Sequence, residues 1–165
     1  MSEPISIYHD GEQWCASRGD LVGYGTTPDA ALAALLAQLP KYITTTKVGR
    51  AKFAAAHQTG ILPRITHLAF GNGGHDPATG EPVEFDDNRT TVPGQFATLR
   101  PVSSVTANGM ICTIVGRLDY DHEVGQIVST CGLIDSAGDL IAYKNFSPKA
   151  KDADTRFEVQ WIEQF

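Results

Sequence analysis

The residues that could support chemistry lie close together between positions 71 and 88. The run Gly71-Asn72-Gly73-Gly74 has the glycine content of a phosphate-binding loop, whose backbone amides hold an anion. It lacks the Gly-Lys-Ser/Thr ending of such loops, and Pro77 and Gly80 follow where a helix is required. His75-Asp76 has the residue types of an oriented base, but no Ser or Cys stands in a nucleophile motif. A turn with solvated neighbours is the favoured interpretation of this run.

Oxygen-bearing side chains follow in the same stretch, at Glu84, Asp86, Asp87 and Asn88. They suit a divalent cation, yet the Asp-x-Asp-x-Asp-Gly spacing is missing, so a solvated acidic loop is the favoured interpretation. The five histidines show no HxH or HExxH spacing, which argues against zinc. The sequence therefore predicts no catalytic residue, no metal and no cofactor, and we do not expect an enzyme.

The three cysteines, Cys15, Cys112 and Cys131, are odd in number and form no CxxC pair. This pattern argues against a disulfide framework and favours synthesis in a reducing cytosol. Cys112 and Cys131 lie among apolar strand residues, so we expect small core residues and not reactive thiols.

The composition indicates a soluble globular protein, and the length predicts one domain or one domain with a small appendage. A chain of 165 residues can bury roughly 70% of its unfolded surface without disulfides or metals. A net charge of −6 and thirteen scattered Lys and Arg residues disfavour nucleic acid as a partner. No signal peptide is visible, and the longest apolar run, 30–37, is too short to span a bilayer.

The segment 1–40 is expected to form a small ββα unit. Apolar alternation predicts a meander of two or three short strands over 5–25, with a turn at Asp10-Gly11. Thr27 as N-cap and Pro28 as first helical residue start a helix that Pro40 ends. Its predicted apolar stripe consists of Leu32, Leu35, Leu36 and Leu39.

The segment 42–165 begins with a helix and a strand. The helix body spans 48–58, one of the threonines 44–46 caps it, and Gly60 follows its end. A strand over 61–70 offers Ile65, Leu68 and Phe70 for burial, and a loop then runs from 71 to about 98. Loops of this length are commonly functional or ordered by a partner.

The last third of the chain has the pattern of a β-hairpin from Gly125 to Tyr143. Asp135-Ser136-Ala137-Gly138 tolerates turn geometry, and apolar residues flank it on both sides. The other predicted strands are 99–105, 111–118 with Cys112, Ile114 and Leu118 around Gly116, and 157–162, after a charged connector over 147–154. The elements together predict an α+β fold: a mainly antiparallel sheet with one or two packed helices, preceded by the small ββα unit.

Two separated segments carry a resemblance to a known family. The first runs from Thr46 to Gly73, a T-x-x-G helix followed by a strand and a glycine-rich turn. The second is the hairpin, which reads G-L-I-D-x-x-G-D-L-I-A from Gly132 to Ala142. In this order and spacing they resemble the phage tail-collar fibre family, the N-terminal region by which tail fibres of tailed bacteriophages attach to the baseplate. The resemblance covers about residues 42–165.

The resemblance implies a structural protein of a phage or prophage, made in the bacterial host cytoplasm and placed in the virion tail. There it would attach tail fibres to the baseplate or collar, or form part of it, by protein–protein assembly and not catalysis. The implied partners are other tail or baseplate proteins and further copies of the chain, with a trimer possible, and neither nucleic acid nor membrane. Because the chain ends where the anchor's last strand ends, we expect an adaptor or baseplate-side protein, not a complete fibre.

Three positions depart from the family's pattern. Asn72 stands where the glycine turn often carries Asp, and Thr130 replaces the acid two residues before the Gly-Leu pair. Ala97 replaces an acid in the middle strand, before the retained Arg100. Any ion pair made by those acids is therefore in doubt here, whereas the topology is not.

Two sets of residues are candidates for contact with partners. Aromatic residues are enriched at interface anchors, and four lie near the end of this chain: Tyr143, Phe146, Trp161 and Phe165. The candidates in the partner-ordered loop are Gly71, Asn72, Gly73, Gly74, Asp86 and Asp87. An alternative function is a partner-binding or regulatory module that uses the N-terminal ββα unit. Its segment from Tyr24 to Leu32 is faintly similar to the turn-into-helix of antitoxin-like modules, but an ordinary helix start is the favoured interpretation.

Overall fold

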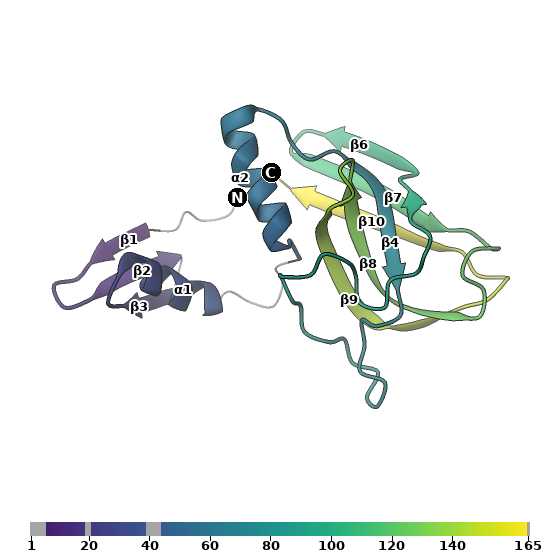
Figure 1. Cartoon of the computed structure of the whole chain (residues 1–165), viewed down its shortest axis with the longest axis horizontal. Coiled ribbons are helices and arrows are strands. Elements are labelled where there is room, and N and C mark those ends of the chain that lie inside the picture. Colours follow the sequence, from purple (N-terminus) through teal and green to yellow (C-terminus); the bar gives the residue numbers. More distant parts are fainter. Residues whose placement is uncertain (1–5, 19–20, 39–43, 165) are drawn as a thin grey trace. The chain divides into compact units, whose positions relative to one another are not determined.

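The computed structural model describes residues 6–18, 21–38 and 44–164, which belong to two compact units, Met1–Ile43 and Thr44–Phe165 (Figure 1). Antiparallel strands are the dominant secondary structure, which confirms the mainly antiparallel prediction. They form three sheets and not one, and only two helices accompany them in the described residues, so the α+β label fits loosely. Neither helix in these ranges is long and apolar enough to cross a membrane. The boundary predicted near 40–42 lies outside the described residues.

The smaller unit is a three-stranded meander followed by a helix. β1 (Ser6–His9), β2 (Trp14–Arg18) and β3 (Leu21–Gly25) are neighbours in that order, as predicted. The Asp10 carboxylate holds the first turn by accepting hydrogen bonds of 2.9 Å from the amides of Glu12 and Gln13. The Thr27 hydroxyl caps α1 (Pro28–Gln38), accepting a hydrogen bond of 3.2 Å from the amide of Ala30.

Helix α1 packs directly on the backbone of β3. A Cβ added at Gly23 would lie 2.1 Å from the Leu35 nitrogen, so no side chain fits between strand and helix at this position. Ala31 and Leu35 are accordingly the buried residues of the helix, and Leu32 is only partly buried. The other two residues of the predicted stripe, Leu36 and Leu39, lie outside the described side chains.

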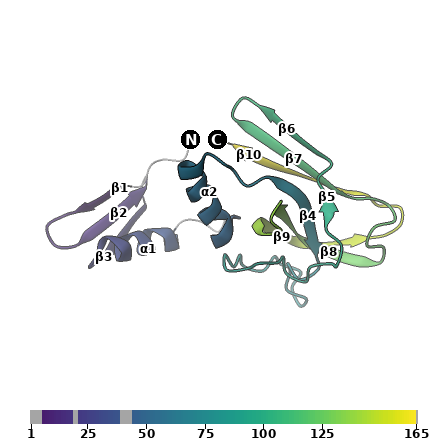
Figure 2. The same cartoon turned by 45° about the horizontal axis from the view of Figure 1, so that its top comes forward.

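The larger unit contains two antiparallel sheets, seen as separate layers in Figure 2. One sheet has the strand order β5-β4-β8-β9, and the other has the order β10-β7-β6. The first sheet consists of β4 (Ile65–Gly71), β5 (Arg100–Pro101), β8 (Gln126–Asp135) and β9 (Leu140–Lys151). The second consists of β6 (Ser104–Asn108), β7 (Ile111–Leu118) and β10 (Phe157–Gln164).

An apolar core joins the two sheets. Leu68 and Phe70 of β4 pack in one cluster with Ile114 and Leu118 of β7. The sheets come close at Gly116, where an added Cβ would lie 2.3 Å from Leu68 Cδ2. The predicted apolar face around Gly116 is therefore confirmed.

The helix and the hairpin of the larger unit are as predicted. Thr46 is the N-cap of α2 (Lys47–Thr59), and Gly60 follows the helix with a φ of 72°. In the hairpin turn, Asp135 Oδ1 accepts hydrogen bonds of 3.0 Å from the amides of Ala137 and Asp139. Gly138 completes the turn with a φ of 87°, which favours glycine.

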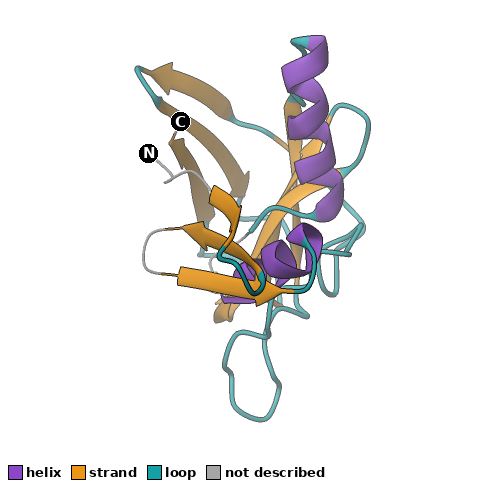
Figure 3. Cartoon of the chain, turned by 90° about the vertical axis from the view of Figure 1, so that its left-hand side faces the viewer, coloured by secondary structure: helices purple, strands orange, loops and turns teal. Residues whose placement is uncertain are grey.

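Three predicted elements differ in extent. The strand predicted over 61–70 begins only at Ile65, because Pro63 cannot donate a ladder hydrogen bond. The strand predicted over 99–105 is divided between β5 and β6, which belong to different sheets. The connector predicted over 147–154 is wrong for 147–151, which complete β9 and pair with β8. The predicted loop is confirmed: between 72 and 99 the described chain has isolated bridges but no strand (Figure 3).

Candidate interaction site

The start of α2 is fixed on the backbone of β9. The Thr46 amide donates to the Ile141 carbonyl (2.9 Å), and the Thr46 hydroxyl donates to the Leu140 carbonyl (2.6 Å). The same hydroxyl oxygen accepts the Gly49 amide at 3.0 Å. A Cβ at Gly49 would lie 2.2 Å from the Ile141 oxygen, so helix and strand touch at this glycine. The two segments that carry the resemblance thus meet in one packed junction.

A lysine between two acids strengthens this junction. Lys52 of α2 forms ion pairs with Asp135 and with Asp139, the latter at 2.6 Å. Burial would raise the pKa of Asp135, but the Lys52 ammonium and two backbone amides outweigh it, so the pKa is lowered. The Asp135 hydrogen bond is the main cause that raises the pKa of Lys52. The hairpin turn and the helix are therefore held by charge as well as by packing.

The glycine turn is ordered by the chain itself. The amides of Asn72 and Gly73 donate to the carbonyls of Gly94 and Pro93, both at 3.1 Å. The Gly74 amide donates to the Ser129 hydroxyl at 2.9 Å. Because these amides already have acceptors, they do not form a phosphate cradle.

The acidic part of the loop is also held by intramolecular contacts. The Asp86 amide donates to the Tyr143 hydroxyl (2.7 Å), which in turn donates to the Asp86 carbonyl (3.0 Å). Asp87 pairs with Arg50 at 2.5 Å, and Asn88 Oδ1 accepts the Lys47 ammonium at 2.6 Å. Among the described residues no group of three or more potential ligands could hold a metal ion. Asp86 and Asp87 thus both have contacts within the described chain.

The four candidate aromatic residues have different environments. Tyr143 is fully buried and its ring lies 4.6 Å from that of Phe85, so it does not reach the surface of this chain. The reason is strand alternation: Ala142 faces the core between the sheets, and Tyr143 faces the loop side. Phe146 and Trp161 are partly buried against the inter-sheet core. Phe165 lies outside the described residues.

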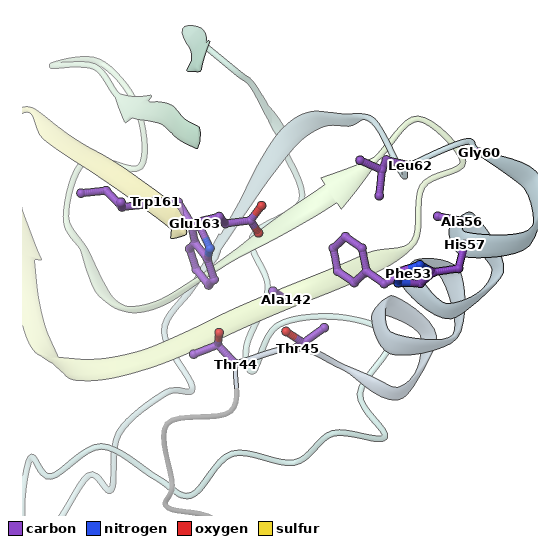
Figure 4. A pocket seen from close by; sticks show the side chains of 11 residues that line it. Thr44, Thr45, Phe53, Ala56, His57, Gly60, Leu62, Ala142, Trp161 and Glu163 are labelled. Carbon is purple, nitrogen blue, oxygen red and sulfur yellow. The ribbon is translucent and has the colours of Figure 1, made fainter. Parts of the chain in front are cut away.

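Trp161 helps to line an open groove of about 600 Å³ between α2 and the end of β10. Figure 4 shows Trp161 and Glu163 of β10 on one side, Phe53 and His57 of α2 on the other, and Ala142 between them. A second hollow of about 590 Å³ continues it towards β4 and β6, and shares Phe53, Leu62 and Glu163 with the first. We call the two together the α2–β10 groove. Of the three residues that line both hollows, Phe53 and Leu62 are apolar and Glu163 is acidic.

Glu163 is the unusual residue of this groove. It is partly buried, and desolvation is the cause that raises the pKa of its carboxyl. Among the described residues, no basic side chain forms an ion pair with the Glu163 carboxylate, and no group donates a hydrogen bond to it. The sequence held a signal that the prediction missed. Phe157, Val159 and Trp161 alternate on the inner side of β10, and the next inner position carries an acid instead of an apolar residue.

Thr130, which departs from the family pattern, and the retained Arg100 both make polar contacts within the chain. Thr130 is buried, and its hydroxyl donates to the Lys144 carbonyl at 3.2 Å. Arg100 pairs at 3.0 Å with Glu123, and both side chains are largely buried. Arg100 therefore has a carboxylate partner from another part of the sequence.

The cysteines are consistent with structural roles. Cys131 is buried in the inter-sheet core, and desolvation raises the pKa of its thiol to about 12. Cys112 is partly buried in the same region, and Cys15 is buried in the smaller unit.

No family model matches the chain, and no curated protein or solved structure matches it.

Proposed function

We propose that this chain is a structural protein of a phage or prophage tail, with a tail-collar-like α+β domain over 42–165. It acts by assembly at the baseplate or collar, binding other tail proteins and copies of itself. The observation that carries the proposal is the junction of the two resemblance segments. Thr46 and Gly49 of the helix segment pack on Leu140 and Ile141 of the hairpin segment. The two resemblance segments therefore form one structural unit.

The contacts of this structural unit fit a role in assembly. The Thr46 hydroxyl and the Lys52 ammonium both fix the helix on the hairpin, and the α2–β10 groove lies directly beside this junction. Ala142 belongs to the hairpin motif and also lines the groove. A rigid junction next to an open apolar surface is what a docking module requires.

The test is the protein composition of density-purified tailed particles from cells that express a tagged chain. We expect the tagged chain in the particles, and a Gly49→Leu variant, which cannot form the junction, to be depleted from them. Particles that assemble fully without any wild-type chain would contradict the proposal.

A second candidate function is a partner-binding module in the smaller unit. Tyr8 and Tyr24 flank Cys15 across the three strands and are about half exposed, at 47% and 53%. They lie on the face opposite α1, because the neighbouring Gly23 faces the helix. Deletion of residues 1–40 tests this candidate: if the shortened chain enters particles as well as the full chain, the smaller unit is not needed for assembly.

A further inference from the structure

The α2–β10 groove holds an acid whose charge the chain does not compensate. Glu163 lies among Phe53, Leu62 and Trp161, and no basic side chain pairs with it in the described residues. Removing a carboxylate from water without a cation costs free energy. A partner that brings a cation to this point would recover that cost.

The α2–β10 groove is also lined by a positively charged residue, Arg64, which has no ion pair among the described residues. Arg64 lines the groove in the connector between α2 and β4, and its side chain is exposed. Its backbone carbonyl accepts the Ser136 amide at 2.9 Å, so the position of the residue is fixed. Arg64 and Glu163 line the same hollow, yet they do not pair with each other within the one chain.

Apolar side chains stand beside Arg64 on the connector. Ile61 is 75% exposed and Leu62 is 60% exposed, although both are large and apolar. Neighbouring exposed apolar residues rimmed by charge are typical of protein interaction sites. The rim thus offers apolar contact area and one charge of each sign.

We propose that a second copy of this chain docks in the α2–β10 groove, with Arg64 of each copy pairing with Glu163 of the other. The argument for a second copy is charge complementarity: the patch holds both members of the pair, so it is complementary to itself. A two-fold axis through such a patch makes the contact twice. Ile61 and Leu62 of each copy then cover the apolar lining of the opposite groove.

Charge reversal tests the proposal on the full chain by light scattering over a range of concentrations. We expect the wild type to self-associate, and Arg64→Glu and Glu163→Arg each to raise the dissociation constant at least about tenfold through like-charge contact. An equimolar mixture of the two variants should associate again, because each restores the missing charge of the other. Glu81→Arg, on the loop outside the groove, is the matched control and should associate like the wild type.

The mixture makes the test independent of folding. Arg64 is exposed, so Arg64→Glu is not expected to unfold the chain, and circular dichroism checks this for each variant. A wild type that stays monomeric at its highest soluble concentration overturns the inference, as does a mixture that fails to associate. This inference rests on the proposed assembly function, and the two can fail separately. If the chain is monomeric in solution but is found in tail particles, the inference is wrong, while the proposed attachment to other tail proteins stands. If the chain self-associates but is absent from particles, the proposed function is wrong, while the inference stands.

Discussion

Substitution of Gly49 by alanine gives the sharpest test of the helix–hairpin junction, because two effects have opposite signs. Alanine is the better helix former, and in an unobstructed helix the exchange would stabilise by up to about 1 kcal/mol. In this structure the added Cβ lies 2.2 Å from the Ile141 oxygen. A carbon atom cannot lie at such a short distance from a backbone oxygen, so α2 must move away from β9.

The magnitude follows from what the movement breaks. Overpacking costs about 1–3 kcal/mol, and loss of the Thr46 cap costs about 1 kcal/mol. After the gain in propensity, we expect a net loss of about 2 kcal/mol in the free energy of unfolding.

Urea unfolding followed by tryptophan fluorescence measures this loss. The chain has two tryptophans, so a Trp14→Phe background leaves Trp161 as the only reporter, in the larger unit. Ala54→Gly, at an exposed position of α2, is the control for helix propensity and should cost about 1 kcal/mol. A Gly49→Ala variant that is more stable than its parent would refute the close contact between helix and hairpin.

Further predictions concern the charges and hydrogen bonds of the larger unit. Lys52→Gln should destabilise by about 1–2 kcal/mol at neutral pH, because it leaves the buried Asp135 without its cation. The lowered pKa of Asp135 means that this stabilisation is present above pH 3.8 and is lost as the pH falls through the folded-state pKa, so acid should abolish the difference in urea midpoint. The pKa of Glu163 is raised, so the dilute, monomeric wild type should lose stability as the pH rises through it, whereas Glu163→Gln should show no such loss. Tyr143→Phe should cost about 1 kcal/mol and speed hydrogen exchange at the Asp86 amide, and unchanged exchange would show that the hydroxyl does not hold the loop.

Locally determined features could be predicted from the sequence. The Thr46 cap and the glycine at position 60 act within one helical turn, so residue type and position suffice. The hairpin turn is similar, because Asp135 bonds to amides two and four residues ahead. Elements that depend only on neighbours in sequence are readable without the tertiary structure.

The second half of β9 could not be read in this way. Lys149 and Lys151 suggest a solvated connector, yet Lys151 is 1% exposed. Its ammonium donates to the carbonyls of Tyr120 (3.1 Å) and Asp152 (2.8 Å), so a contact 31 residues away makes burial tolerable. The sequence pattern around position 147 contains no sign of that distant acceptor.

The candidate site was predictable only in part. The enrichment of aromatic residues at interfaces predicts both Trp161 and Tyr143 as contact residues. Trp161 lines the groove, whereas Tyr143 is buried because strand alternation turns it to the other face. Arg64 and Glu163 were missed, since nearly a hundred residues separate them and only the tertiary fold brings them to one groove. The pairing that we propose between two copies depends on a surface and not on a local pattern.

Electron microscopy of purified tailed particles that carry a gold label on a tag in this chain tests the central claim most directly. The account predicts that the label is found at the baseplate or collar, on particles that contain the chain as a regular component. Tailed particles without label, or label on the capsid alone, would contradict it.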